Sequence, residues 1–319
     1  QTLIKTIDLT TSPVPVVSIP GQTTPPVVPG WPAVKLTSVA VDPVSNTVYV
    51  GDFISTNVYV IDGSTNTVTG AVMTQDLRTT VDIGTFQAGV AGYGPMSLMA
   101  NPLTNTWSYL GIGGGAHFSG TTFLEALNNE SLQNAATWDP VTNNIYSGGG
   151  QFLVTNNLKF IGAGYACAGN TMATAANTFT GRVYALCGNT LSGVFLAYNG
   201  AGFKDKRIAN PAIAGIAAPI NPAGVAVNPN TNRIYVSSLS RVDGLDVIDG
   251  VTHSIIATIP GLDGAVPLLS STVKPRPIAV HTGANTIFVI NPGSSSVAMF
   301  DGATNTLLQD RKSTRLNSS

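Results

Sequence analysis

The sequence has little charge and no long apolar run, and both shortages limit what the protein can do. Only 10% of the 319 residues are charged, and the formal net charge is -1. A nearly neutral chain lacks the basic surface that binds nucleic acid or an anionic membrane. Its apolar runs fall well short of the roughly 18 residues of a membrane-spanning helix. We therefore expect neither a nucleic-acid partner nor a membrane span.

Residues and motifs that commonly carry catalysis are also scarce. The three histidines, His117, His253 and His281, show no paired spacing that favours a metal site. Two glycine clusters occur, Gly113–Gly115 and Gly148–Gly150. Neither is followed by a Gly-Lys-Ser/Thr motif, which excludes a phosphate-binding loop of that type. No Gly-x-Ser-x-Gly motif occurs, so a serine hydrolase with that nucleophile elbow has no support. We expect no catalytic residue, no cofactor and no metal site.

The composition is dominated instead by turn formers and small polar residues. The chain has 34 glycines and 20 prolines, and threonine, asparagine and serine supply most of its polarity. This composition is similar to that of secreted and surface β-proteins. We expect an extracytoplasmic location: periplasmic, secreted or on the cell surface.

One hairpin pattern recurs along the chain. An alternating apolar strand ends in Asp or Asn, small polar residues follow, and a second apolar strand begins. The pattern is plain in "VAVDPVSNTVYV", "VAVNPNTNRIYV" and "IAVHTGANTIFV" and weaker in three further copies. The residues just before the turn are Val41, Ala100, Trp138, Ala176, Val227 and Val280. A repeat period of roughly 40–50 residues with several short strands predicts a β-propeller.

Each plain copy continues with a third strand, an acidic turn and a fourth strand. The acidic residues are Asp62, Asp249 and Asp301. We therefore predict an all-β propeller of four-stranded antiparallel blades, in one domain over residues 1–309. Six blades are complete, and residues 1–9 are expected to form an additional outer strand.

These repeats resemble a known family. "VAVDPVSNTVYV…YVIDGSTNTV", "VAVNPNTNRIYV…DVIDGVTHSI" and "IAVHTGANTIFV…AMFDGATNTL" are similar to YVTN-type β-propellers, a group related to YncE-like periplasmic proteins and archaeal surface-layer proteins. The resemblance covers three blades well and the middle of the chain loosely. It implies a propeller fold and says little about activity, because this fold hosts many functions.

Both ends of the sequence suggest a fragment. The outer strand at residues 1–9 lacks inner strands of its own, so we expect a natural protein of seven blades, with a six-bladed ring as the alternative. At the other end, "DRKSTRLNSS" at residues 310–319 departs from the composition of the rest. It resembles the translation of a sequencing adapter; the alternative is a solvated basic tail. We expect this tail to pack against nothing.

Loop length separates two faces of the predicted propeller. The turns within the hairpins are short and regular, whereas long loops gather on the other face, at 18–32, 74–95, 208–222 and 260–277. Long loops on a rigid scaffold are where binding residues are usually found. The candidate binding residues on this face are Trp31, Tyr93, Gly114, His117 and Gly149, and the expected ligand is an unidentified protein or glycan.

The recurrent acidic residues allow two interpretations. Asp62, Asp249 and Asp301 could be calcium ligands or catalytic carboxylates, or they could accept hydrogen bonds from their own turns. We favour the turn interpretation, because residues in separate blades on the regular face cannot converge. His253 and His281 also occupy turns, and His117 follows a glycine run on the long-loop face.

The two cysteines bracket one hairpin of the fourth blade. Cys167 lies just before the first strand and Cys187 at the end of the second. Antiparallel pairing brings these ends together, so a disulfide would suit an oxidising compartment. Two buried free thiols are the alternative.

Two classes of function remain open at this point. The first is a non-catalytic scaffold or recognition module of the cell envelope that binds through the long-loop face. The second is a lactonase-like or lyase-like enzyme with a divalent metal in the central channel, held by Glu, Asp, Asn or His from several blades. The innermost strands carry titratable residues only at their ends: Asp42, Asp139 and His281. The first hypothesis is therefore favoured.

Overall fold

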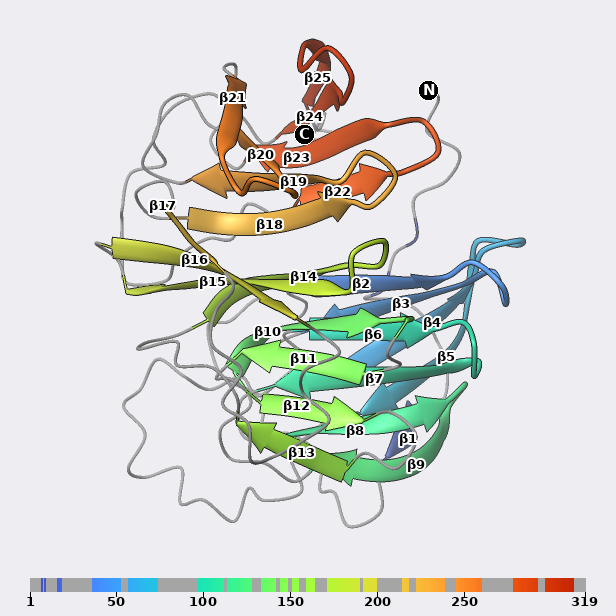
Figure 1. Ribbon diagram of the computed structural model, residues 1–319. Coiled ribbons are helices and arrows are strands. Elements are labelled where there is room, and N and C mark those ends of the chain that lie inside the picture. The colour runs from blue at the N-terminus through green and yellow to red at the C-terminus, as the bar shows by residue number, and fades with distance from the viewer. Residues whose placement is uncertain are drawn as a thin grey trace. The chain divides into compact units, whose positions relative to one another are not determined.

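The computed structural model (Figure 1) is all-β in the part of the chain that it describes. The described residues are 7, 9, 16–18, 36–52, 57–73, 97–111, 114–127, 133–141, 144–148, 151–154, 159–163, 171–189, 192–199, 214–217, 222–238, 245–259, 278–291 and 296–312. Among them, no helix is long and apolar enough to cross a bilayer.

The strands form six sheets in which four successive strands pair as antiparallel neighbours, in the manner of propeller blades. Blade 1 contains β2 (Leu36–Asp42), β3 (Thr47–Asp52), β4 (Asn57–Asp62) and β5 (Thr67–Met73). Blade 2 contains β6 (Ser97–Asn101), β7 (Thr106–Gly111), β8 (Gly114–Ser119) and β9 (Thr122–Leu127). Blade 3 contains β10 (Gln133–Asp139), β11 (Asn144–Gly148), β12 (Gln151–Val154) and β13 (Lys159–Ala163).

The remaining three blades have the same order. Blade 4 contains β14 (Thr171–Asn177), β15 (Arg182–Asn189), β16 (Ser192–Asn199) and β17 (Ala214–Ala217). Blade 5 contains β18 (Pro222–Asn228), β19 (Arg233–Ser238), β20 (Leu245–Asp249) and β21 (Ile255–Ile259). Blade 6 contains β22 (Ile278–His281), β23 (Thr286–Asn291), β24 (Ser296–Asp301) and β25 (Leu307–Lys312). The predicted fold, an all-β propeller of four-stranded antiparallel blades, is confirmed.

The chain divides into two compact units. The first comprises Gln1–Pro140 and Val154–Lys159, and the second comprises Val141–Leu153 and Phe160–Ser319. Blades 1 and 2 belong to the first unit, and blades 4, 5 and 6 belong to the second. Each unit is considered by itself below.

Two kinds of turn shape each blade. The first turn joins strands one and two, and the second turn joins strands three and four. In the best-described copies of both, the fifth turn residue has a positive φ, which Asn and Gly tolerate better than other residues. These residues are Asn46, Asn66, Asn105, Gly181, Asn232, His253, Asn285 and Asn305, with φ between 48° and 64°. The recurrent "D-x-x-x-N" spacing of the sequence therefore encodes turn geometry.

In blades 1, 5 and 6 the second turn docks onto the first turn through one glycine. The N–H groups of Gly63, Gly250 and Gly302 donate to the carbonyl oxygens of Asn46, Asn232 and Asn285, at N–O distances of 2.8, 2.9 and 2.7 Å. A Cβ added at Gly63 would lie 2.6 Å from Asn46 Oδ1 and 2.8 Å from its carbonyl oxygen. Only glycine fits, which explains why Asp-Gly recurs at this turn.

Each sheet has two apolar faces, and they pack in a fixed order. We call one the valine face; it contains Val225 and Val227 in blade 5 and Ile278 and Val280 in blade 6. The other is the alanine–aromatic face, with Ala40 and Tyr49 in blade 1, Ala175 and Tyr184 in blade 4, and Ala226 and Tyr235 in blade 5. The pairing registers place the alanine and the tyrosine of each pair opposite each other in neighbouring strands. In the second unit, the valine faces of blades 5 and 6 pack against the alanine–aromatic faces of blades 4 and 5.

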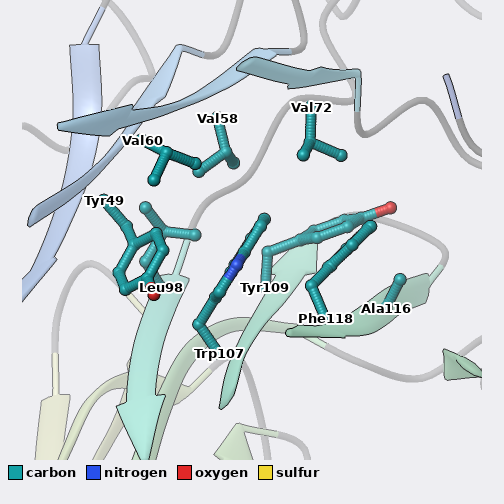
Figure 2. Close-up of a cluster of buried hydrophobic side chains, with 9 residues drawn as sticks. All are labelled: Tyr49, Val58, Val60, Val72, Leu98, Trp107, Tyr109, Ala116 and Phe118. Atoms are coloured by element: carbon teal, nitrogen blue, oxygen red, sulfur yellow. The ribbon is translucent and has the colours of Figure 1, made fainter. Parts of the chain in front are cut away.

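The first unit follows the same order with larger rings. Figure 2 shows Tyr49, Val58, Val60 and Val72 of blade 1 gathered against an aromatic group from blade 2. Trp107 is the centre of this group; its ring stacks at 5.1 Å from Tyr49 and at 4.5 Å from Phe118. Its indole N–H is satisfied by the carbonyl oxygen of Gly120 at 2.7 Å. A fully buried tryptophan thus keeps its polar group paired.

The N-terminal segment differs from the sequence prediction. Of the outer strand expected over residues 1–9, the structure describes only Ile7 and Leu9, and neither lies in a strand. A short strand, β1 (Val16–Ser18), instead pairs in parallel with the outer strand β5, Val16 opposite Ala71. The addition covers part of an edge that would otherwise offer unpaired backbone groups.

The C-terminal prediction was wrong for three residues. Asp310, Arg311 and Lys312 were expected to pack against nothing, but they continue β25, opposite Ala298, Val297 and Ser296. The backbone of β24 presents its hydrogen-bonding groups up to Ser296, and a strand can pair with them whatever its side chains are. Residues 313–319 lie outside the described part.

The glycine of the second turn yields a direct test. We expect Gly250→Ala to destabilise the protein by about 2 kcal/mol, since overpacking of this kind typically costs 1–3 kcal/mol. The added Cβ would meet both Oδ1 of Asn232 and, at 2.7 Å, its carbonyl oxygen. Urea denaturation measures the change.

Gly283→Ala is the matched control, because Gly283 also lies in a turn but its added Cβ would approach nothing closer than His281 Cε1 at 3.4 Å. It should alter stability by no more than about 0.5 kcal/mol. If Gly250→Ala and Gly283→Ala lowered the free energy of unfolding equally, the close contact between the two turns would not be the cause of the destabilisation.

Candidate functional site

The structure describes only part of the predicted binding face. Trp31, Tyr93 and Gly149 lie outside the described residues, and so does Cys167. Gly114 begins β8 and pairs with Gly111. Cys187 lies in β15 opposite Thr171. The binding role of this face and the disulfide therefore stay predictions.

His117 is not a loop residue, contrary to its expected placement. It lies in the middle of β8, and its side chain is only 8% exposed. Its Nδ1 is 2.8 Å from Oγ of Ser108 on the neighbouring strand. Burial lowers the pKa of His117 below its usual range. The glycine run before His117 favoured a loop, but Gly114 and Gly115 are the first residues of β8.

The Ser108–His117 pair replaces an aromatic residue of the other blades. Ser108 occupies the second-strand position that holds Tyr49, Tyr184 and Tyr235 elsewhere. The pair is buried, with Ser108 only 3% exposed. The arrangement satisfies two polar side chains inside a packed sheet, which is a structural role. The sequence signal for it was the serine in "WSY" where other repeats have tyrosine.

The recurrent acidic residues act in their own turns, as predicted. Oδ1 of Asp249 accepts the N–H groups of Val251 and Thr252, both at 2.9 Å. Asp62 and Asp301 accept the equivalent N–H groups two and three residues further along. At Asp62 the hydroxyl of Ser64 lowers the pKa of the carboxyl most, and the backbone N–H groups add to the shift. At Asp249 and Asp301 the backbone N–H groups are the main cause of a pKa below the usual value. Each carboxylate is thus committed to its own backbone.

Two histidines take over positions that Asp or Asn hold elsewhere. His281 stands at the start of a first turn, where its Nδ1 accepts the N–H of Ala284 at 2.9 Å. His253 stands at the positive-φ position of a second turn, with φ 56°. Both are turn residues, which confirms the sequence interpretation.

His253 also joins blades 4 and 5. Nη1 of Arg182, in blade 4, donates to the carbonyl oxygen of Gly250 at 2.8 Å and lies 3.1 Å from Nε2 of His253. The ring of Tyr184 meets the His253 ring edge-on at 6.1 Å. Burial and the neighbouring Arg182 charge lower the pKa of His253, and Asp249 opposes this shift. The neutral imidazole is therefore the form that fits beside the guanidinium.

Asparagine side chains form a second link between blades. Nδ2 of Asn177 in blade 4 donates to Oδ1 of Asn232 in blade 5 at 2.7 Å. Nδ2 of Asn228 in blade 5 donates to Oδ1 of Asn285 in blade 6, also at 2.7 Å. In both cases the first residue of one first turn reaches the positive-φ residue of the next. The first turns are thus connected side chain to side chain.

Blade 1 carries a carboxylate at the donor position of this link. Asp42 is fully buried; its Oδ1 accepts the N–H groups of Val44 and Ser45, while its Oδ2 has no hydrogen-bond partner. Burial, together with the charge of Asp42, raises the pKa of Tyr49 to about 12. Asp42 is therefore a buried acceptor where blades 4 and 5 place an amide donor.

A further buried carboxylate was missed by the sequence reasoning. Asp246 in β20 is 2% exposed, and its Oδ1 accepts the hydroxyl of Thr258 at 2.7 Å. Its sequence signal is the aspartate in "LDVID", where blade 1 has tyrosine in "VYVID". Among the described residues, no three or more His, Cys, Asp or Glu side chains come together in a way that could hold a metal ion.

The regular turns expose apolar side chains that the sequence reasoning also missed. The third residue of the first turn is a large apolar residue in four blades, and its sequence signal is the apolar residue after Asp-Pro, Asn-Pro or Asn-Thr. In the first unit these are Val44, 76% exposed, and Leu103, 68% exposed; in the second they are Val141, 63%, and Phe179, 76%. Single exposed apolar residues are common on protein surfaces, so they do not define a site by themselves.

Comparisons with known proteins do not assign this chain to a family. No protein-family model matches the chain, and no curated protein matches it.

The contrast between asparagine and aspartate at the inter-blade position gives two opposite predictions. Asn228→Asp should destabilise the protein by about 2 kcal/mol, because it replaces the buried amide donor and leaves Oδ1 of Asn285 facing an acceptor. Asp42→Asn should leave stability unchanged or raise it, because it removes a buried charge whose Oδ2 has no partner. Urea midpoints of the two variants measure both changes, and a large loss in Asp42→Asn would contradict this account.

The histidine link predicts a loss of stability in mild acid. The fold favours neutral His253, while the unfolded chain takes up a proton near pH 6.5. The stability that this preference supplies is present above that pH and declines as the pH falls toward the lower pKa of the folded state. His253→Asn, which keeps a residue suited to positive φ, should flatten the decline between pH 7.5 and 5 in denaturant titrations. His117 should leave a residual slope in the same direction, and an unchanged slope would exclude a contribution from His253.

Proposed function

We propose that this protein is a non-catalytic scaffold or recognition module that works outside the cytoplasm. The observation that supports this best is the use of its recurrent polar groups. Asp62, Asp249 and Asp301 accept hydrogen bonds from their own turns. Asn177 and Asn228 join neighbouring blades. The side chains that repeat with the blades therefore build a rigid frame.

The proposal includes a resemblance at the level of the repeats. The "YVIDGSTNTV"-type segments are similar to YVTN-type propellers, and the propeller fold is consistent with that resemblance. Only 10% of the residues are charged, a composition similar to that of secreted and surface β-proteins, and this similarity supports an extracytoplasmic location.

Ligand binding is proposed for the long-loop face, around Trp31, Tyr93, Gly114, His117 and Gly149. Support for it comes from the sequence, where the long connections gather on one side of a regular scaffold. The buried position of His117 makes it a support for that part of blade 2 and not a contact residue. The proposed ligand is a protein or glycan of the cell envelope.

A loop replacement tests this proposal. Residues 74–95 are replaced by a short Gly-Ser linker, and binding to purified envelope glycans and surface proteins is measured by calorimetry. We expect at least a tenfold loss of affinity in this variant. The matched control, Val44→Ser with Leu103→Ser, changes two exposed turn residues and should bind as the unmodified protein does.

The alternative function is a metal-dependent propeller enzyme. Hydrolysis of lactones by the purified protein with added calcium or zinc would overturn the non-catalytic proposal. If binding survives the loop replacement but is lost in the Val44→Ser, Leu103→Ser variant, the ligand binds at the regular turns and not at the long-loop face.

A further inference from the structure

Asp-Gly is a dipeptide at which a polypeptide chain readily rearranges by itself. The glycine nitrogen has no side chain beside it to hinder its approach, and it can attack the side-chain carbonyl carbon of the aspartate. The sequence contains this dipeptide at Asp62, Asp243, Asp249, Asp263 and Asp301. Asp62, Asp249 and Asp301 begin the second turns of blades 1, 5 and 6, and the other two lie outside the described residues. The structure therefore shows how three of these reactive pairs are held.

The rearrangement needs only the chain and water. A bond forms between the glycine nitrogen and Cγ of the aspartate, and the hydroxyl of the neutral carboxyl leaves with the amide proton as water. Water then adds to the main-chain carbonyl carbon of the resulting five-membered imide and breaks its bond to nitrogen. The product is isoaspartate, in which the main chain runs through Cγ and is longer by one methylene.

In each docked turn the attacking nitrogen is already engaged. The N–H groups of Gly63, Gly250 and Gly302 donate to carbonyl oxygens of the first turn at N–O distances of 2.8, 2.9 and 2.7 Å. The nucleophile is the deprotonated nitrogen, and a proton held between nitrogen and a carbonyl oxygen is hard to remove. Gly250 and Gly302 are also buried, which keeps hydroxide away from their N–H groups. Docking thus suppresses the nucleophile.

The same turns hold the carboxyl in its less reactive form. The attack needs a neutral carboxyl, because a carboxylate is a poor electrophile. The Ser64 hydroxyl at Asp62, and the backbone N–H groups at Asp249 and Asp301, lower the pKa of these carboxyls and so favour the carboxylate. Oδ1 of Asp301, for example, accepts the N–H groups of Ala303 and Thr304 at 2.7 and 2.9 Å. Both reacting groups are therefore restrained by one turn.

We propose that Asp62, Asp249 and Asp301 are isoaspartate-forming sites that the docked turns keep unreactive, so that opening of a turn sets the rate of chemical ageing in its blade. Opening frees the glycine nitrogen and releases the carboxyl in the same step. The docked turn has no room for a longer main chain: a single Cβ added at Gly302 would lie 2.8 Å from the carbonyl oxygen of Asn285. A turn that has isomerised therefore cannot dock again.

The unmodified protein provides the first test. It is kept folded, or unfolded in urea, in neutral buffer at physiological temperature for several weeks. After proteolysis, liquid chromatography separates isoaspartyl peptides from aspartyl peptides of equal mass. The folded protein should form isoaspartate at all three sites about tenfold more slowly than the unfolded chain, because reaction then requires local opening. Equal rates in the two states would overturn the proposal.

A matched pair of variants opens one turn and leaves the others docked. Asn285 has φ 48°, which a β-branched residue adopts only with strain, so Asn285→Val should weaken the docking of Gly302. Asn285→Gly also loses the asparagine side chain but keeps the positive φ, and Gly181 already occupies this position in blade 4. Asn285→Val should accelerate the reaction at Asp301 several-fold, and Asn285→Gly should leave it near the unmodified rate.

The two other sites serve as references within the same chain. Asp62 and Asp249 should react in Asn285→Val as slowly as in the unmodified protein. An unchanged rate at Asp301, or equal acceleration by valine and glycine, would show that docking of the turn does not control the reaction. Equal acceleration at all three sites would show that unfolding of the whole protein controls it, and this too would contradict the proposal.

Discussion

One hydrogen bond constrains blades 1, 5 and 6: the glycine N–H of the second turn donates to the asparagine carbonyl of the first turn. It exists in blades 1, 5 and 6 at nearly the same length. The two turns can approach this closely only because the glycine has no Cβ and the asparagine accepts a positive φ. The contact ties strands one and two to strands three and four at one end of the sheet. The Asp-Gly and Asn residues of the repeat are therefore explained by a single steric requirement.

The same requirement directs the polar side chains. With the turns fixed, the aspartate at the start of the second turn meets its own N–H groups, and the asparagine of one first turn meets the next. Apolar residues then fill the space between sheets, with valine faces against alanine–aromatic faces. A frame that uses its repeated polar groups in this way suits a scaffold, and it leaves specificity to residues that do not repeat.

The fold could be predicted because its signals are local and repeated. Alternation of apolar residues and the five-residue turns recur often enough to fix strand number and order within a blade. The acidic turns and the roles of His253 and His281 followed from the same repeats. Three features could not be predicted, for different physical reasons. His117 follows glycines, which are common in loops, but here the strand β8 begins within the glycine run. The strand β1 has only three residues, too few to show an alternating apolar pattern in the sequence, and it pairs in parallel. Asp310–Lys312 extend β25 through backbone pairing, which does not depend on their side chains. The predicted binding residues are non-repeating, so no second copy in the chain supports their placement.

Amide hydrogen exchange of the second-turn glycines tests the central claim most directly. If the docked turns hold each blade together, the N–H groups of Gly63, Gly250 and Gly302 should exchange as slowly as those of the central strands, although they lie in turns. The N–H groups of the residues that follow them should exchange faster, because these donate to partly exposed carboxylates. Rapid exchange at the three glycines, at the rate of an ordinary surface turn, would contradict the account.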